Sequence, residues 1–415
     1  MNNIASANSN CRICKSEIFE EILDFGDLAL TGVFEVEGSG VQRAPMKLNR
    51  CVECGLVQLA HNYKAEYLYG ETYGYESHLN LSMVDHLKRK ASLLEELFLN
   101  RPGRKTVVDI ASNDGTLLSG FKSKDLDLIG IDPLIDVVGD YYPNKVVKIK
   151  EFFTSLAYKS VTSREATLVT SLSVLYDLED PIRFARDVNS ILEEGGIWHF
   201  EQSYLPTMLE TLSYDTICHE HLLYLSMHDI QNILSATGFE TVSASLNSVN
   251  GGSIAVTARK SSSSQNHLNP PFVEFLLRNE IKAGYQDGTA LRQFAVDAEI
   301  HREDLGQLID AYLDKGFSVF GLGASTKGNV LLQWLNLDSS KLQAIGDINP
   351  RKFGHQTPGT GIQIVSEGSL LEKFGQQSVA LVLPWHFRDG IVRNTWEYQS
   401  KGGNLLFPLP KIQIV

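Results

Sequence analysis

The sequence predicts an α/β protein in three parts: an N-terminal zinc ribbon, a central Rossmann-like sheet and a second, C-terminal Rossmann-like α/β domain. Two Cys-x-x-Cys pairs near the N-terminus predict the ribbon. Two strand–turn–helix patterns, at 107–115 and 317–329, are each accompanied by further strands and predict the two sheets. The 415 residues are enough for two or three domains with cores of their own. We place these domains at 1–70, 71–265 and 266–415.

The composition limits the partners and the compartment. Lys and Arg number 37 against 50 Asp and Glu, a net charge of −13, which argues against a nucleic-acid partner bound through phosphate neutralisation. The first ten residues are polar, unlike a signal peptide, and no apolar run approaches the ~20 residues needed to span a bilayer. We therefore expect a cytoplasmic protein with reduced thiols and no membrane partner, as a monomer or small homo-oligomer.

Four of the five cysteines form the two pairs Cys11–Cys14 and Cys51–Cys54. Two residues between thiols let both sulfurs reach one ion at ~2.3 Å, and two such pairs complete a tetrahedral zinc site. Two disulfides, or four unrelated thiols, are the alternatives. Because four thiolates fill the coordination shell, we expect this zinc to be structural and the chemistry to lie further along the chain.

The expected elements of the central sheet alternate between strand and helix. Helical periodicity covers 82–98, with Met83, Leu87, Leu94 and Leu97 on one side. Strands are expected at 106–110, 126–131, 167–170, 196–200 and 252–258, and helices at 181–192 and 228–237. This alternation predicts a parallel, doubly wound sheet. After a linker at 261–271, a helical region at 272–315 leads into the second sheet, with strands beginning at 317, 343 and 379.

The turn after the first strand of the central sheet is a candidate cofactor site. An acidic strand residue, Asp109, precedes a turn of small residues, and Asp132 follows at the end of the next strand, where ribose hydroxyls commonly bind. Gly115 is the only glycine in the turn, which suits adenosylmethionine better than the pyrophosphate of NAD. A plain turn with surface carboxylates is the alternative. The candidate cofactor-binding residues are Asp109, Ala111, Asn113, Asp114, Gly115, Asp132, Ser171 and Ser173.

The stretch from Tyr214 to His228, which contains Cys218-His219-Glu220-His221, has the densest cluster of ionisable groups. Three adjacent residues cannot share one face, and the i, i+4 spacing of a helical zinc motif is absent. Histidine and carboxylate side chains suit acid–base chemistry near neutral pH, although a polar loop joining two domains is an alternative. The fifth cysteine, Cys218, is either a nucleophile beside a histidine or a buried inert thiol.

The second sheet carries a candidate anion site in the turn 321–329. Free amides at a helix N-terminus, with Ser325, Thr326 and Lys327, suit a diphosphate, although the Walker spacing is absent and a tight packing turn is the equal alternative. A tyrosine-rich stretch at 63–75 is either packing between modules or a lid over a ligand. The candidate substrate-binding residues are Tyr75, Tyr224, Ser325, Thr326, Lys327 and Asn329.

Taken together, these motifs resemble the nucleotide-sugar C-methyltransferases of deoxysugar and O-antigen pathways. The likeness spans nearly the whole chain and is carried by the Cys-x-x-Cys ribbon and by the motifs at 54–59, 112–117, 219–221, 250–253 and 323–329. It implies a class I methyltransferase sheet that binds adenosylmethionine, between a zinc-binding domain and a C-terminal C-methyltransferase domain. It also implies that Glu220 or His221 removes a proton beside the ketone of a 4-keto sugar nucleotide. The enolate carbon would attack the methyl group, while the second sheet holds the nucleotide diphosphate.

The chain departs from the family pattern at two positions. Cys218 stands where a tyrosine usually precedes His-Glu-His, and Asp177 stands where the loop after Thr170 usually carries a histidine. Both changes alter how enolate charge would be stabilised, and a lost donor at such a site costs several kcal/mol. Two alternatives follow: a diverged enzyme that uses the same ligands for another reaction, or a non-catalytic protein that binds adenosylmethionine or a sugar nucleotide.

Overall fold

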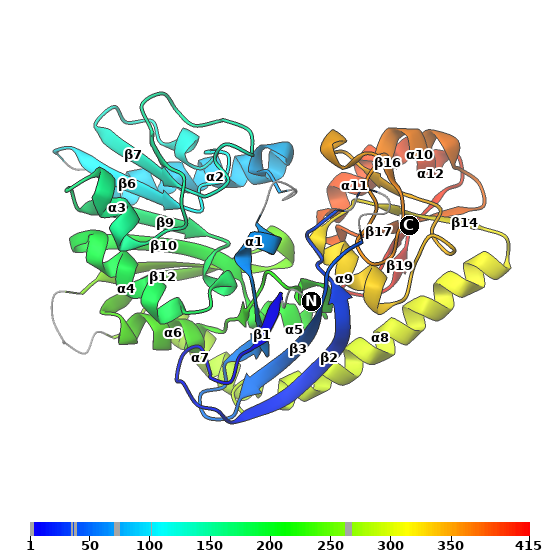
Figure 1. Ribbon diagram of the computed structural model, residues 1–415, viewed down its shortest axis with the longest axis horizontal. Helices are drawn as coiled ribbons and strands as arrows, with labels where there is room; N and C mark the ends of the chain where they lie inside the picture. Colours follow the sequence, from blue (N-terminus) through cyan, green and yellow to red (C-terminus); the bar gives the residue numbers. More distant parts are fainter. Residues whose placement is uncertain (1–3, 35, 37–39, 70–74, 101, 262–267) are drawn as a thin grey trace.

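In the computed structural model, residues 4–34, 36, 40–69, 75–100, 102–261 and 268–415 are described. The expected domain boundaries at residues 70 and 71 and at 265 and 266 lie outside these ranges, as does Tyr73 of the tyrosine-rich stretch. Figure 1 shows a seven-stranded sheet in one lobe and a six-stranded sheet in the other. The strands of the N-terminal part lie between the two lobes at their base.

The N-terminal part is built on a four-stranded antiparallel sheet of order β11-β4-β3-β2. Its strands are β2 Phe19–Ala29, β3 Arg43–Cys51, β4 Val57–Leu59 and β11 Leu223–Tyr224. Alternate side chains of β3 are buried, as expected of a sheet with one face on a core. A second pair, β1 Ala5–Ala7 and β5 His61–Tyr63, precedes α1 Ala65–Leu68. The edge strand β11 comes from the middle of the chain, which the sequence did not predict.

The central sheet has the order β12-β13-β10-β9-β6-β7-β8. Its strands are β6 Lys105–Ile110, β7 Leu126–Ile131, β8 Val147–Ile149, β9 Ala166–Leu172, β10 Leu192–Ser203, β12 Phe239–Asn247 and β13 Ser253–Lys260. The five from β8 to β10 are parallel, as expected, but β13 and β12 pair antiparallel. The sequence analysis did not predict β12. Only the first residue of this strand is buried, and most of its residues are polar, so it lacks the apolar pattern of a buried strand.

Helices cover both faces of this sheet: α2 Leu81–Leu94, α3 Ser155–Val161, α4 Pro181–Ile191, α5 Leu205–Glu210 and α6 Met227–Ala236. The helix predicted at 82–98 is confirmed in its extent and, at Met83, Leu87 and Leu94, in its buried face, but not at Leu97. The chain widens into a π-helical turn at Glu95–Leu99, which leaves Leu97 60% exposed, whereas Leu94 is buried. The extra residue in that turn moves Leu97 off the apolar stripe.

The C-terminal sheet has the order β16-β15-β14-β17-β18-β19, parallel except for β19. Its strands are β14 Ser318–Leu322, β15 Ile345–Asp347, β16 Ile364–Ser366, β17 Ser378–Val382, β18 Asn404–Phe407 and β19 Gln413–Ile414. Helix α7 Pro271–Lys282 packs on α6 and β12 of the central lobe. The helices that follow are α8 Thr289–Asp314, α9 Thr326–Trp334, α10 Glu367–Lys373, α11 Arg388–Asn394 and α12 Trp396–Ser400. The long α8 runs from the N-terminal strands to this sheet (Figure 1).

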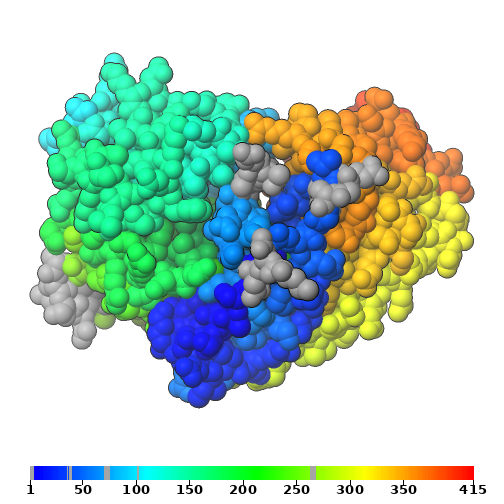
Figure 2. All heavy atoms as spheres, in the orientation of Figure 1, coloured from blue at the N-terminus to red at the C-terminus, as the bar shows by residue number. Residues whose placement is uncertain are grey.

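One apolar cluster extends through all three parts, including Leu48 of β3, Trp198 of β10 and Leu331 of α9. Figure 2 shows the N-terminal residues wedged between the two lobes. The three parts therefore share a core, which fixes the lobes against the N-terminal strands. Within the described residues, no helix is long and apolar enough to cross a membrane.

The contrast between Leu94 and Leu97 gives a stability test with its own control. We expect Leu94→Ala to lower the free energy of unfolding by about 2–5 kcal/mol, because a buried leucine leaves a cavity. The same change at exposed Leu97 should alter it by no more than about 0.5 kcal/mol. Denaturant unfolding followed by fluorescence measures both. Equal losses would contradict the burial of only one of the two side chains.

Candidate functional site

The four ribbon thiols meet at one point. Their sulfur atoms all lie within 4.8 Å of one another, with Cys11–Cys54 and Cys14–Cys51 separated by 3.5 Å. Tetrahedral ligands at ~2.3 Å from a zinc ion stand ~3.8 Å apart, whereas disulfide sulfurs are bonded at ~2.05 Å. The geometry therefore fits a zinc ion bound by four thiolates and not two disulfides, and it leaves no position for a substrate.

Each Cys-x-x-Cys turn has the same backbone geometry. The amide of Lys15 donates to the Cys11 carbonyl and the amide of Gly55 to the Cys51 carbonyl, both over 3.0 Å. Lys15 and Gly55 take φ values of 66° and 83°, which glycine adopts without strain. The second turn leads directly into β4. The buried Arg12 guanidinium donates to the Leu59 carbonyl over 2.8 Å and ties the first turn to β4 as well.

The candidate cofactor turn lies at the C-terminal end of β6, where the strand order of the central sheet reverses. Ligands of open α/β sheets bind at such a switch point. Ala111, Asn113 and Gly115 all have positive φ, which curls the backbone into a tight turn. A Cβ at Gly115 would lie 2.5 Å from the Tyr142 ring, so only glycine fits there.

Two carboxylates flank this turn. The Asp109 side chain is buried and accepts a hydrogen bond of 2.7 Å from Thr170, and burial raises its pKa to about 7. Among the described residues no cation pairs with it, so it suits the ammonium group of adenosylmethionine. Asp132 accepts from the amides of Asn113 and Leu134, and burial raises its pKa. The donor set therefore fits adenosylmethionine.

The other predicted cofactor residues have different surroundings. Asn113 and Asp114 bind the segment before α2: the Asn113 carboxamide bonds to Ser77, and Asp114 accepts from the His78 amide over 2.8 Å. The buried Ser171 hydroxyl accepts from the Trp198 indole, whereas exposed Ser173 has a positive φ of 58° just beyond β9. The turn residues are thus held in place by the segment that contains Tyr75.

Tyr75 itself is 45% exposed, and its carbonyl accepts from the Asn113 side chain. The backbone of Tyr75 therefore lies beside the cofactor turn.

The His-Glu-His side chains point in three directions. His219 is buried against the N-terminal strands, with its ring edge-on to Tyr63 at 4.9 Å between centroids, and burial lowers its pKa to about 4. Glu220 faces Thr31, whose hydroxyl lies 3.2 Å from Oε2. His221 bonds through Nδ1 to the Thr216 carbonyl over 2.9 Å and packs on Tyr176. As expected of adjacent residues, they do not share one face.

Strand pairing positions this segment. Immediately after it, Leu223 and Tyr224 pair with Gln58 and Val57 of β4. The amide of Leu59 also donates to the Leu222 carbonyl over 2.9 Å. The zinc turn that begins β4 is therefore connected through one strand pair to the His-Glu-His segment.

The space beside His221 is small and enclosed. A cavity of about 10 Å³ is lined by Tyr176, His221 and Tyr224 among others, which is close to the volume of one water molecule. The Tyr224 hydroxyl is buried without a hydrogen-bond partner. Tyr224 was predicted to bind substrate, and its unpaired hydroxyl leaves it available to a ligand.

Three weak acids lie together on the Glu220 side. Burial raises the pKa of Glu220, and it raises those of Asp177 and Cys218 well above their ordinary values, with the Glu220 charge adding to both. One oxygen of Asp177 and one of Glu220 are buried without hydrogen-bond partners. The fully buried Cys218 thiol is therefore held in its protonated form, which disfavours a nucleophilic role.

Lys327, from the C-terminal sheet, lies near one of these acids, Cys218. Its ammonium donates to the Asn250 carbonyl over 2.7 Å, and its charge acts on Asp215, Cys218 and His221. Burial lowers its pKa. The predicted anion turn of the C-terminal sheet thus reaches the His-Glu-His segment.

The sequence did not single out Asp215, although it is fully buried and accepts from the Trp385 indole over 2.8 Å. No motif marks this aspartate.

The turn at 323–329 and the cofactor turn share one kind of contact, which the sequence analysis did not predict. Asp347, at the end of β15, accepts from the Ala324 amide over 2.8 Å and from the Asn349 amide over 2.7 Å. Asp132 accepts from Asn113 and Leu134 in the same way, over 2.9 and 2.7 Å. The rule that selects Asp132, an acid at the end of the second strand, also selects Asp347.

The remaining predicted residues of this turn lie at the start of α9. The Ser325 hydroxyl caps the helix by accepting from the Gly328 amide, and Thr326 follows as the first helical residue. The buried Asn329 side chain donates to the Thr31 carbonyl over 2.7 Å, so it holds the N-terminal part and not the turn itself.

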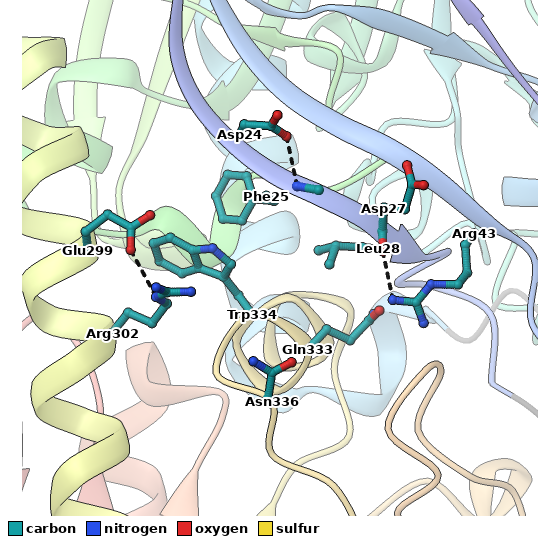
Figure 3. Close-up of a pocket in the computed structure, with 11 residues that line it drawn as sticks. Asp24, Phe25, Asp27, Leu28, Arg43, Glu299, Arg302, Gln333, Trp334 and Asn336 are labelled. Atoms are coloured by element: carbon teal, nitrogen blue, oxygen red, sulfur yellow. Dashed lines mark hydrogen bonds and ion pairs between the residues drawn. The ribbon is translucent and has the colours of Figure 1, made fainter.

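A larger cavity of about 450 Å³ lies elsewhere, between β2, α8 and α9 (Figure 3). Phe25 and Trp334 form its apolar wall, and Arg302 stacks over the Trp334 ring. None of the predicted catalytic, cofactor or substrate residues lines it.

The chain is similar to known proteins over most of its length. Three family models match: a zinc binding domain over residues 11–69, a methyltransferase domain over 83–244 and a C-methyltransferase C-terminal domain over 248–410. The chain is 26% identical to C-methyltransferase NovU of Streptomyces niveus over 420 aligned positions, which cover 100% of this chain and 99% of NovU.

Solved structures overlap with part of the chain. Magnesium protoporphyrin IX methyltransferase (ChlM) from Synechocystis PCC 6803, with bound SAM, is 16% identical, with a TM-score of 0.33 over 44% of this chain and 81% of its own. An O-methyltransferase family protein from Burkholderia thailandensis is also 16% identical, with a TM-score of 0.32 over 45% and 59%.

The thiol cluster, the turn with its two carboxylates and the matched domains define an adenosylmethionine-dependent methyltransferase with a structural zinc site. The matched C-terminal domain and the full-length relative narrow the class of methyltransferase to C-methyltransferases. The chain belongs to the C-methyltransferase family that combines a zinc-binding, a methyltransferase and a C-terminal C-methyltransferase domain, and it methylates carbon.

The zinc assignment predicts the metal content of cysteine variants, and the fifth cysteine, Cys218, provides the control. Metal analysis should find one zinc ion per chain, lost in Cys51→Ser because the site then lacks one of its four thiolates. Cys218→Ser should retain it, since Cys218 lies outside the cluster. Loss of zinc from both variants, or from neither, would contradict the assignment.

The buried Asp109 predicts how cofactor affinity changes with pH. Its pKa of about 7 means that the carboxylate becomes charged as the pH rises from 6 to 8, so adenosylmethionine should bind more tightly over that range. Asp109→Asn should weaken binding by roughly tenfold at pH 8 and reduce the pH dependence. Calorimetric titration measures both. Asp127→Asn, on the neighbouring strand and paired with Arg104, is the control and should bind like the unaltered protein.

Proposed function

We propose that the protein methylates the carbon beside the ketone of a 4-keto deoxysugar linked to a nucleoside diphosphate. The observation that carries this proposal is a contact beside the His-Glu-His segment: helix α9, which begins at the anion-type turn and carries Lys327, packs against residues 214–216. A ligand with its diphosphate at the start of α9 would extend its sugar toward that segment. Membership of a C-methyltransferase family supports a carbon nucleophile.

Carbon methylation beside a ketone requires removal of a proton from that carbon. His221 suits this role because the Thr216 carbonyl can only accept, so Nδ1 carries the hydrogen and Nε2 keeps a lone pair. Burial, followed by the Lys327 charge, lowers the His221 pKa to about 3, which keeps the ring neutral at pH 7. A neutral imidazole is available as a base but is a weak one.

Glu220 is the second candidate base. Its Oε1 is buried and has no hydrogen-bond partner, and burial raises its pKa toward the range in which a carboxylate removes protons effectively. The Glu220 and His221 side chains bond to different elements, Thr31 and Thr216, so the two bases can be tested separately.

The electrons of the broken C–H bond move onto the ketone oxygen, where negative charge develops. Lys327 supplies the positive charge nearest to this segment, and the unpaired Tyr224 hydroxyl can donate a hydrogen bond. In the family pattern a phenol and an imidazole stand at the positions of Cys218 and Asp177. Here both positions hold acids that burial keeps protonated, and each can still donate a hydrogen.

Adenosylmethionine, when bound at the turn after β6, supplies the methyl group that the enolate carbon accepts. The enclosed surroundings of His221 exclude bulk water, which favours transfer to carbon over return of a proton from solvent.

The test separates proton removal from methyl transfer. In D₂O with S-adenosylhomocysteine, the protein should exchange the proton beside the ketone of a 4-keto sugar nucleotide, and with adenosylmethionine it should add one methyl group. Replacement of the base, by Glu220→Gln or His221→Asn, should slow exchange by about 10²- to 10⁴-fold. Mass spectrometry and proton NMR follow the two reactions. His228→Asn, outside the site, is the control.

Full exchange and methyl transfer in both Glu220→Gln and His221→Asn would reject the mechanism. Binding of the nucleotide and the cofactor without exchange in the unaltered protein would favour a non-catalytic binding protein. Exchange without methyl transfer would favour a diverged reaction at the same site.

A further inference from the structure

The segment that follows β2 brings residues of the zinc-binding part into contact with Glu220. Thr31 is fully buried, and its hydroxyl donates to Glu220 Oε2 over 3.2 Å. The other carboxylate oxygen, Oε1, is also buried but has no hydrogen-bond partner. The two oxygens therefore have different surroundings, one held by a threonine and one left open.

The next residue, Gly32, packs directly against Oε1. A Cβ at Gly32 would lie 2.1 Å from Glu220 Oε1 and 3.6 Å from the Thr326 hydroxyl. Any side chain there would displace the carboxylate. Only glycine therefore permits the orientation in which Thr31 binds one oxygen and Oε1 lies buried beside residue 32.

Helix α9 holds this segment at both ends. The Asn329 amide donates to the Thr31 carbonyl over 2.7 Å. Gln333 accepts from the Ala29 amide over 2.7 Å and donates to the Ala29 carbonyl over 3.1 Å. Figure 3 shows Gln333 extending from α9 toward β2. All three side chains, of Thr31, Asn329 and Gln333, are buried, so the threonine hydroxyl cannot swing to water.

Burial opposes the ionisation of Glu220, and the titratable groups that face it are acids. These are Asp177, Tyr63 and Cys218, and a charge on Glu220 would oppose their own ionisation. In a low-dielectric site, a carboxylate that accepts no hydrogen bond takes up a proton. A donated hydrogen bond favours the charged form, and the Thr31 hydroxyl donates one.

We infer that Thr31 is a positioning residue that fixes the orientation of the Glu220 carboxylate and favours its ionised form, leaving Oε1 without a hydrogen bond. The inference rests on the proposed function only for the role of Glu220 in proton removal. By this inference, the zinc-binding part contacts the reacting site directly through Thr31, and α9 holds that contact in place.

Thr31→Val tests the inference because it removes the hydroxyl and keeps the shape, and Thr31→Ser restores the hydroxyl. Difference infrared titration against Glu220→Gln isolates the carboxyl band of Glu220 in each protein. We expect the Glu220 carboxyl group to titrate at a higher pH in Thr31→Val than in the unaltered protein. In Thr31→Ser it should titrate at the same pH as in the unaltered protein. Zinc content and adenosylmethionine affinity should stay the same in all three and show that the fold is intact.

With a 4-keto sugar nucleotide as substrate, the acidic limb of the kcat profile should move to higher pH in Thr31→Val, with a roughly tenfold loss of rate below it. The KM for adenosylmethionine should not change. If Thr31→Val loses its zinc, Thr31→Ala replaces it, since it adds no methyl group to the site. An unshifted Glu220 titration in the hydroxyl-free variant, or no recovery with serine, would overturn the inference.

The activity assay and the infrared titration test the two proposals separately. If the unaltered protein acts on no keto-sugar nucleotide, the proposed function is rejected, while the infrared titration still decides the role of Thr31.

Discussion

The pairing of β11 with β4 is the constraint on which the site depends. Two residues, Leu223 and Tyr224, add to the edge of the N-terminal sheet immediately after the His-Glu-His segment. The zinc turn fixes the start of β4, because Cys51 and Cys54 both bind the ion and Gly55 completes the turn. A structural metal site therefore holds the His-Glu-His segment in place through one strand pair.

Burial decides what this segment can do. Glu220, Asp177 and Cys218 have raised pKa values because they share a site with little water and few donors. The histidines are kept neutral by the same desolvation. Lys327 brings a positive charge to this neutralised group of side chains from the other sheet. The result is a site in which an ionised oxygen has few competing partners, which suits the formation of an enolate.

In both sheets, the turn after the first strand is held by an aspartate in the same way. In each, an acid at the end of the second strand accepts from an amide of the first turn and from the amide two residues ahead, as Asp132 and Asp347 do. The sequence predicted Asp132 by its position and the same rule predicts Asp347. Thr31 and Asp215 carry no such signal, since their partners are 189 and 170 positions away along the chain.

The sequence by itself determined the thiol cluster, the turn after β6, the order of most strands and the presence of the His-Glu-His segment. These depend on local spacing, periodicity and turn chemistry, which a single stretch of chain contains. Only the tertiary structure decided that β11 joins the N-terminal sheet, that Lys327 reaches His221 and that Thr31 contacts Glu220. Such contacts join distant segments across a shared core, and burial, which sets the protonation of these groups, exists only once that core has formed.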